Sequence, residues 1–232
     1  MKICLRREKL PWHQGQASLN ILHLSDLHLK WKGRSLCQVE PLIAALQPDV
    51  IAMTGDYYDT PRGAAVFLAF VERVSRRCPV YWIRGNHDRW LPAKSLQQLR
   101  QLPQTFCVDD QACTYRSPGG TLYEIVSWAQ HLSVLPQRNA GQRRIVLLHN
   151  PERIAVDRLA GCDLLLAGHL HGAQFIFRRC HDGSFFPGNL LYRWCGDRHE
   201  IDATTVIVSK GLGDTLPLRF RCPKEVVFVE IR

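Results

Sequence analysis

Five short polar blocks, each placed at the end of an apolar run, are the part of this sequence best suited to chemistry. Their shared feature is side chains that bind metal ions: carboxylates, an amide and imidazoles. The blocks are Ser25-Asp26-Leu27-His28, Gly55-Asp56-Tyr57-Tyr58-Asp59, Gly85-Asn86-His87-Asp88, Leu148-His149-Asn150 and Gly168-His169-Leu170-His171-Gly172. Together they offer enough ligands to hold two divalent ions side by side, an arrangement that hydrolyses phosphate esters.

The first two blocks supply the carboxylates. Asp26 and His28 are one residue apart, so on an extended loop both side chains point the same way. Asp56 follows Gly55, whose conformational freedom permits a turn that aims the carboxylate over the end of a strand. A single carboxylate between the other ligands suits a bridging position. Asp59 is expected to cap the following loop or accept a hydrogen bond rather than bind metal.

The third block is the most specific. Asn86 can give a metal a neutral oxygen, which limits the build-up of negative charge beside Asp56. The next residue, His87, is then displaced from the ligands toward the substrate, and Asp88 is predicted to orient it, as carboxylates fix imidazole tautomers. The alternative is an ordinary turn that contains an Asn-His pair.

The last two blocks supply imidazoles. His149 ends an apolar run, where a lone histidine is more often a core residue, but it precedes Asn150-Pro151 at a predicted helix start. His169 and His171 are one residue apart between glycines and can each face a different ion. The other histidines are expected to be structural or on the surface; they are His13, His23, His131, His181 and His199.

Strand-length apolar runs precede these blocks and must position them. The runs cover residues 20–24, 49–53, 79–83, 144–148 and 162–167. Unbroken apolar runs are typical of strands that are covered on both faces. Asp26 to Asp56 and Asp56 to Asn86 are both thirty positions, the length of one strand-helix unit. We therefore predict an α/β fold with the blocks on loops at one sheet edge.

The remaining helices and strands are predicted from sequence patterns alone. Helices are expected at 39–47, 64–76, 95–102 and 152–159. Further strands are expected at 106–108, 112–115, 121–126, 174–179, 204–208 and 226–231. The length of 232 residues suits a single domain, 1–232, with residues 1–18 as an N-terminal extension.

The net charge and the cysteines indicate the surroundings in which the protein works. The net charge of +9 indicates anionic surroundings, although the paired arginines, such as Arg6-Arg7, are expected to be mostly solvated. Nine cysteines without a Cys-x-x-Cys pair argue against a zinc ribbon or a disulfide framework, and favour reduced thiols. Neither a membrane span nor a secretory signal is evident, so a cytoplasmic location is expected.

In this order the five blocks resemble the calcineurin-like metallophosphoesterase superfamily, from about residue 20 to residue 231. The tail, residues 208–225, further resembles a bacterial branch of small phosphodiesterases, with membrane-associated enzymes and UDP-2,3-diacylglucosamine pyrophosphatases of lipid A synthesis. The resemblance implies a layered α/β/β/α sandwich and two divalent ions, manganese, iron or zinc. It assigns one ion to Asp26, His28, Asp56 and His171, and the other to Asp56, Asn86, His149 and His169. His87 then faces the phosphate.

The resemblance also implies the reaction, which is in-line attack of an activated water on phosphorus, with His87, held by Asp88, as proton donor. Arg219 and Arg89 are expected either to assist the substrate phosphate or to form salt bridges. One departure from the family pattern is Leu170 with Gly172-Ala173-Gln174, where relatives carry threonine and Gly-Gly-Gln. This departure spares the ligands and alters the wall of the pocket.

Several substrates and partners stay open. The first expectation is a phosphodiesterase or pyrophosphatase acting on a nucleotide-linked or lipid-linked substrate, of which UDP-2,3-diacylglucosamine is one example. The alternatives are a phosphomonoesterase or cyclic-nucleotide phosphodiesterase, and a non-catalytic scaffold, which would lack a ligand. Specific binding to nucleic acid is not expected, whereas peripheral association with an anionic membrane fits the basic charge.

Overall fold

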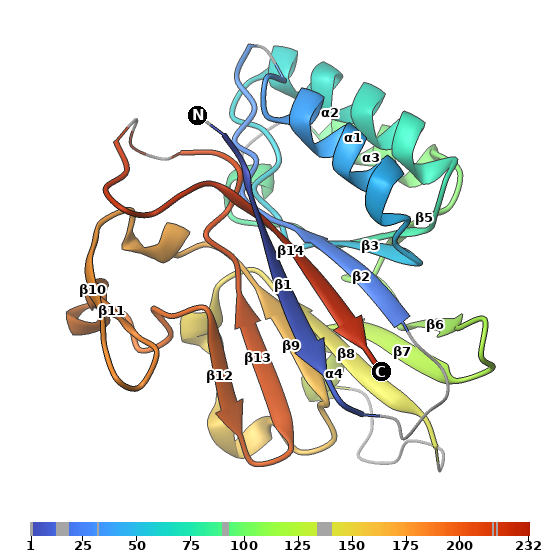
Figure 1. Ribbon diagram of the computed structural model, residues 1–232. Helices are drawn as coiled ribbons and strands as arrows, with labels where there is room; N and C mark the ends of the chain where they lie inside the picture. The colour runs from blue at the N-terminus through green and yellow to red at the C-terminus, as the bar shows by residue number, and fades with distance from the viewer. Residues whose placement is uncertain are drawn as a thin grey trace.

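Two six-stranded sheets form the centre of the protein in the computed structural model (Figure 1). The structure describes residues 2–12, 19–31, 33–89, 93–133, 141–214, 216 and 218–232, so His13 lies outside the described residues. In spatial order the first sheet contains β1 (Cys4–Leu10), β14 (Glu225–Ile231), β2 (Leu19–Leu24), β3 (Val50–Met53), β4 (Val80–Trp82) and β5 (Thr105–Cys107). The second contains β12 (Arg198–Ile201), β13 (Thr204–Val208), β9 (Leu164–Ala167), β8 (Arg143–Leu148), β7 (Leu122–Ser127) and β6 (Cys113–Arg116).

Helices and short turns cover the outer faces of the sheets. On the first sheet lie α1 (Leu36–Leu46), α2 (Pro61–Ser75) and α3 (Ala93–Gln101), which share one apolar cluster with β2, β3 and β4. On the second lie α4 (Trp128–Ser133) and the 3₁₀ turns η2 (Pro151–Arg153) and η3 (Val156–Arg158). The order of layers is therefore helix, sheet, sheet, helix, and the predicted α/β/β/α sandwich is confirmed.

The remaining elements lie on loops or beside the sheets. They are the 3₁₀ turns η1 (His87–Arg89), η4 (His171–Ala173) and η5 (Gly188–Leu190), and the two-stranded hairpin of β10 (Ile176–Arg179) and β11 (Phe185–Pro187). The hairpin projects at the left of Figure 1.

The start of α2 shows how the sequence sets an element. Thr60 has extended backbone and its hydroxyl accepts a hydrogen bond from the Gly63 N–H, while Pro61 occupies the first helical turn, where it loses no bond. Phe67, Phe70 and other apolar residues at helical spacing are buried against the first sheet.

In each sheet the parallel strands have their carboxyl ends at one edge, and these two edges lie together. β2, β3, β4 and β5 are parallel in the first sheet, and β7, β8, β9 and β13 are parallel in the second. The five polar blocks follow β2, β3, β4, β8 and β9 in turn. The five strands predicted to position the blocks are therefore confirmed.

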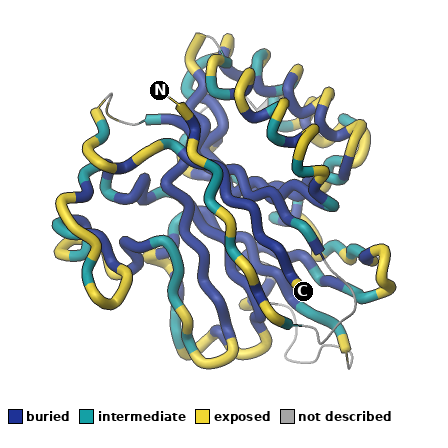
Figure 2. The backbone as a smooth tube through the Cα atoms, viewed as in Figure 1, coloured by how far each residue is buried: buried dark blue, intermediate teal, exposed yellow. Residues whose placement is uncertain are grey.

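The core between the sheets holds these edges in place. Residues of the first sheet such as Ile21 and Val50 share one buried cluster with Ile145 and Leu166 of the second. In Figure 2 the strands are almost uniformly buried, apart from outer strands such as β1 and β12. Because unbroken apolar strands are covered on both faces, neither sheet can slide without exposing its side chains.

Some elements differ from the predictions. The segment 1–18, predicted as an N-terminal extension, includes β1, which pairs in parallel with β14. The single helix predicted at 152–159 is wrong, since the chain forms the two short turns η2 and η3 there. β11 and β12 were not predicted: β11 is only three residues long, and β12 mixes polar and apolar residues without clear alternation.

Arg6 ties β1 to the rest of the molecule. Its guanidinium lies 3.1 Å from Glu225 Oε1 and 3.5 Å from Asp197 Oδ1, and Lys210 contacts the same two carboxylates. The side chain of Arg6 is only 12% exposed, whereas that of Arg7 is 48% exposed. The expectation that both arginines are solvated is therefore wrong for Arg6.

We expect Arg6→Met to lower the free energy of unfolding by about 3 kcal/mol, because removing one partner leaves a buried carboxylate poorly compensated. Arg7→Met is the matched control, and it should lower the free energy of unfolding by less than about 1 kcal/mol. Urea denaturation followed by circular dichroism measures both. Equal losses in the two variants would show that the buried ion pairs do not anchor β1.

Candidate metal centre

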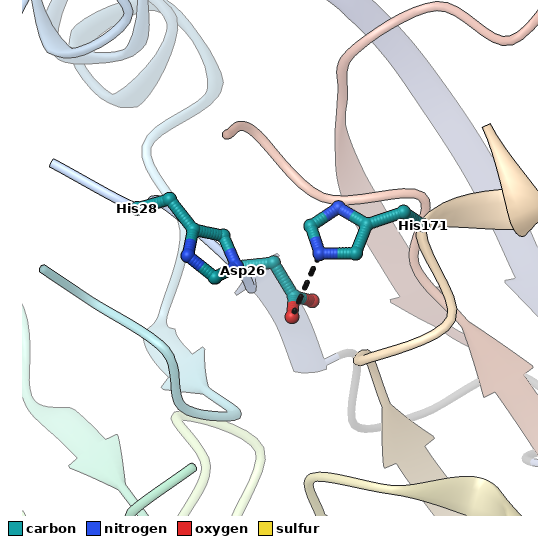
Figure 3. A group of neighbouring side chains, drawn as sticks. All are labelled: Asp26, His28 and His171. Carbon is teal, nitrogen blue, oxygen red and sulfur yellow. Dashed lines mark ion pairs between the residues drawn. The ribbon is translucent and has the colours of Figure 1, made fainter. Parts of the chain in front are cut away.

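The polar blocks converge where the parallel strands of the two sheets end. Asp26, His28 and His171 form one group, and Asp56, His149 and His169 form another; within each group the ligand atoms lie within 4.8 Å of one another. Figure 3 shows the first group, in which His171 Nε2 lies 3.7 Å from Asp26 Oδ1. The sequence places these residues up to 145 positions apart, and the fold brings them together.

Asp56 lies between the two groups. Its Oδ2 atom is 3.7 Å from His28 Nε2 in the first group and 3.3 Å from His149 Nε2 in the second. Asn86 adds its Oδ1 atom 2.9 Å from His149 Nε2. Six of the seven residues predicted as ligands thus form two adjoining groups, Asn86 lies beside the second, and the Asp56 carboxylate lies between the two groups.

Two of the histidines give Nδ1 to an oxygen outside the ligand groups and turn Nε2 toward the carboxylates. His149 Nδ1 lies 2.7 Å from the Thr54 carbonyl, and a carbonyl only accepts, so this nitrogen carries the proton. His28 Nδ1 lies 2.9 Å from Asp59 Oδ1, and the buried Nε2 of His28 has no hydrogen-bond partner among the described residues. Nε2 atoms beside buried carboxylates suit a divalent ion of the first transition row, which takes the place of a proton when it binds.

Without an ion, the protonation of these groups follows their neighbours. Burial acts to lower the pKa of His149, but the hydrogen bond and charge of Asp56 raise it to about 9, and the hydrogen bond to Asp59 raises the pKa of His28. Burial acts to raise the Asp56 pKa, but the hydrogen bond and charge of His149 outweigh it and lower the pKa to about 2. Burial lowers the pKa of His171 to about 4. An ionised carboxylate and a neutral imidazole are the forms that bind metal ions.

The backbone of the ligand loops is strained. Five of the ligand residues have positive φ: Asp26 (51°), His28 (44°), Asp56 (56°), His169 (69°) and His171 (50°). This left-handed conformation is unfavourable for residues with a side chain, and such strain concentrates at functional sites.

Two glycines let the loops approach closely. A Cβ atom at Gly85 would lie 2.1 Å from Asp56 Oδ1, and one at Gly168 would lie 2.3 Å from Asp26 Oδ2. The space beside each carboxylate is thus closed to any larger residue.

The predicted partner of His87 needs correction. The Asp88 carboxylate accepts hydrogen bonds from the backbone N–H groups of Asp56, Tyr57 and Gly85, at 2.7, 2.9 and 2.8 Å. Burial nevertheless raises the Asp88 pKa to about 6. Asp88 therefore joins two ligand loops through their backbones rather than orienting His87.

Asp59 takes the place that was predicted for Asp88. Its Oδ1 atom lies 3.0 Å from His87 Nδ1 and 2.9 Å from His28 Nδ1. Asp59 thus accepts a hydrogen bond, as expected; it also forms a third group of possible ligand atoms with His28 and His87. One carboxylate thus orients both a predicted ligand and the histidine that is predicted to face the phosphate.

A buried hydrogen-bond chain behind Asp26 was missed by sequence reasoning. Ser25 Oγ lies 2.5 Å from Asp26 Oδ2, Thr54 Oγ1 lies 2.7 Å from Ser25 Oγ, and His23 Nε2 lies 2.8 Å from Thr54 Oγ1. Burial lowers the pKa of His23 to about 3, so this histidine is neutral. The available signal was two hydroxyl residues immediately after buried parallel strands.

Arg219 and Arg89, which were expected either to assist the substrate phosphate or to form salt bridges, differ in their surroundings. The side chain of Arg219 is 2% exposed, and its Nε lies 2.6 Å from Asp214 Oδ1, which is the salt-bridge alternative. Its guanidinium also donates to the Gly213 carbonyl and holds the loop against His171. Arg89 is exposed and lines a cleft beside Asn86.

A cleft opens on each side of the ligand groups. The Trp128 cleft, about 290 Å³, is bounded by Asn86, His149 and His169, and also by Trp128, Arg84, Arg89 and Arg153. The Trp31 cleft, about 490 Å³, is bounded by His28, and also by Trp31, Lys30, Arg34 and Lys224. Both clefts therefore combine a ligand residue, an indole and basic side chains.

We expect Asn86→Ala to weaken the binding of one of two ions by about 100-fold or more, because even residues that only orient ligands contribute roughly 10–100-fold. Isothermal titration with Mn²⁺ and the metal content after dialysis measure the change. Asn189→Ala, at a half-buried asparagine in η5, is the control. Full retention of two ions by Asn86→Ala would remove this residue from the centre.

We expect Ser25→Ala to weaken metal binding by about tenfold, because the Asp26 carboxylate loses the hydroxyl that orients it. Ser75→Ala, at a buried serine whose hydroxyl contacts the Glu72 carbonyl in α2, is the control. The same titration applies. An unchanged affinity in Ser25→Ala would show that the hydrogen-bond chain behind Asp26 has only a packing role.

Comparison with known proteins places the chain in a family. The family model described as calcineurin-like phosphoesterase matches residues 19–173. Phosphodiesterase YaeI of Escherichia coli (strain K12) is 27% identical, over 98% of this chain and 87% of YaeI. The uncharacterized metallophosphoesterase YkoQ of Bacillus subtilis (strain 168) is also 27% identical, over 97% of this chain and 87% of YkoQ.

A solved structure shows the same fold. TT1561 of Thermus thermophilus superimposes with a TM-score of 0.53 at 14% identity, covering 84% of this chain and 91% of that protein. Within the described residues there is no helix whose length and apolar character would let it cross a lipid bilayer. The chain belongs to the calcineurin-like phosphoesterases, a family that depends on two metal ions, and it is a metal-dependent hydrolase of phosphate esters.

Proposed function

We propose that this hydrolase is a phosphodiesterase or pyrophosphatase that cleaves a nucleotide-linked or lipid-linked substrate. The observation that carries the proposal is the pair of clefts that flank the ligand groups, each with its own indole and basic side chains. A phosphodiester has substituents on both sides of phosphorus, and each needs a place to lie. A phosphomonoester has only one.

The ligand set supports the use of manganese, iron or zinc in this proposal. Mixed carboxylate, amide and imidazole donors accept all three metals. When bound, the two ions would activate a water molecule and neutralise charge on the phosphoryl oxygens. Asp26, His28 and His171 would hold one ion, Asn86, His149 and His169 the other, and Asp56 would contact both.

His87 is the residue proposed to give a proton to the leaving oxygen. The Asp59 carboxylate fixes its Nδ1 atom at 3.0 Å, which leaves Nε2 for the leaving group. The side chain is 39% exposed, so substrate can reach it. Proton transfer by a positioned histidine contributes about 10²–10⁴-fold to the rate.

The walls of the clefts support a substrate that carries further negative charge and a large group. Arg89 and Arg153 line the Trp128 cleft and are exposed, so they can meet a second phosphate. Trp31 is 65% exposed at the other cleft, a large apolar surface for a nucleobase or an acyl chain. A nucleoside diphosphate linked to a lipid, such as UDP-2,3-diacylglucosamine, combines these features.

We expect turnover of bis-p-nitrophenyl phosphate to exceed that of p-nitrophenyl phosphate, because only the diester occupies both clefts. Release of p-nitrophenol with Mn²⁺ measures both rates, and exhaustive chelation should abolish both. A preference for the monoester would contradict the proposal and favour a phosphomonoesterase.

Turnover of UDP-linked lipids and dinucleotides with Mn²⁺, followed by chromatographic separation of the products, tests the substrate class. Arg153→Ala should raise KM for a pyrophosphate-linked substrate by about tenfold, because a hydrogen bond to a charged group is worth about 1.5–3 kcal/mol. Arg116→Ala, at an exposed arginine in β6, is the control. An identical KM in both variants would exclude Arg153 from substrate binding.

A further inference from the structure

One side of the molecule carries an unusual share of exposed apolar side chains. Of the ten large apolar residues that are exposed in the described part of the chain, six lie in the β10–β11 hairpin, in η5 with the residue that follows it, or in the described residues of the segment 214–224. We call these six side chains the apolar rim: Phe177 (54% exposed), Leu190 (72%), Leu191 (78%), Leu216 (57%), Leu218 (66%) and Phe220 (45%). Exposed apolar patches of this kind mark binding surfaces on soluble proteins.

The two segments of the rim are held together. The buried Gln174 side chain donates to the carbonyl groups of Leu216 and Leu218 at 2.7 and 3.1 Å. The rings of Phe177 and Phe220 lie 5.3 Å apart, and Arg221 donates to the Phe177 carbonyl at 3.1 Å. In Figure 1 the hairpin and the segment lie along the left side of the molecule, and Figure 2 shows much of that side as exposed.

Arginines surround the rim. Arg178, Arg193 and Arg221 are exposed and lie within two residues of a rim side chain along the chain. Residues 174–193 and 214–224 together contain six arginines and lysines against two aspartates, Asp182 and Asp214. Of these aspartates, Asp214 is already paired with Arg219 and Lys224. The surface is therefore both apolar and basic.

We propose that the apolar rim docks the protein onto a membrane of anionic lipids. Leucine and phenylalanine side chains enter the boundary between headgroups and acyl chains, while the neighbouring arginines attract the lipid phosphates. A second copy of the chain fits less well, because it would bring the arginines of two rims together. The charge of the rim thus favours a lipid surface over self-association.

The position of the rim agrees with the proposed lipid-linked substrate, and this step alone rests on the proposed function. Gly213 and Asp214 line the Trp31 cleft, and Leu216 is two positions after Asp214. A membrane that contacts the rim therefore lies beside the mouth of the Trp31 cleft. A substrate whose acyl chains stay in the membrane could then place its phosphate at the centre.

Flotation with lipid vesicles tests the proposal without any turnover, so its failure is distinct from failure of the phosphodiesterase assignment. We expect the protein to float with vesicles of phosphatidylcholine and phosphatidylglycerol, and much less with phosphatidylcholine alone. Leu190→Ser/Leu191→Ser should lower the partition coefficient at least tenfold. Leu132→Ser, at a leucine in α4 that is 52% exposed, should leave it unchanged.

The charge of the rim is tested separately. Arg178→Glu/Arg221→Glu should remove the preference for phosphatidylglycerol, whereas Arg76→Glu, at the exposed C-terminal end of α2, should keep it. An unchanged thermal melting temperature shows that each variant is folded. Absence of flotation, equal loss in Leu132→Ser, or a wild-type dimer that Leu190→Ser/Leu191→Ser dissociates would overturn the membrane proposal.

Discussion

The burial of neighbouring carboxylates is the constraint on which the arrangement of the metal centre depends. Asp26 and Asp88 are fully buried and Asp56 is 2% exposed, all at one meeting point of loops. Buried negative charges are unfavourable unless hydrogen bonds or positive charges compensate them. Backbone N–H groups of His169 and His87 donate to Asp26 and Asp56, and the Asp88 oxygens take three more. The negative charge that these donors do not compensate faces a set of imidazoles. This environment favours cations.

The need for these hydrogen bonds determines the backbone conformation of the ligand loops. For an N–H group to reach a carboxylate across a loop, the chains must approach within hydrogen-bond distance, and at Gly85 and Gly168 only a residue without Cβ allows it. The ligand residues themselves adopt left-handed conformations that are unfavourable by about 1–3 kcal/mol each. The core between the sheets supplies the stabilisation that sustains this strain, because it fixes the ends of β2, β3, β4, β8 and β9 before the loops begin.

The sequence predicted the parts of the site that depend on residues close together in the chain. It failed where the contacts join residues far apart in the chain. Strand-length apolar runs and the thirty-residue rhythm located the ligand loops, since period and length are local properties. The partner of His87 was misassigned because Asp88 is its neighbour in sequence, whereas Asp59 reaches it across two loops. β1 was missed for a similar reason. Its charged residues look solvated until Arg6 meets Glu225, more than two hundred positions away.

The two sides of the centre are not equivalent, and this asymmetry gives the proposed reaction a direction. His87 lies against the first ligand group: its ring centroid is 4.7 Å from that of His28, and both rings contact Asp59. Asp59 in turn lies 3.7 Å from Lys30, which lines the Trp31 cleft. A proton given by His87 would therefore reach an oxygen on that side. For a phosphodiester, the leaving group would thus lie on the side of the Trp31 cleft, beside the apolar rim, and the substituent retained on phosphorus on the side of the Trp128 cleft.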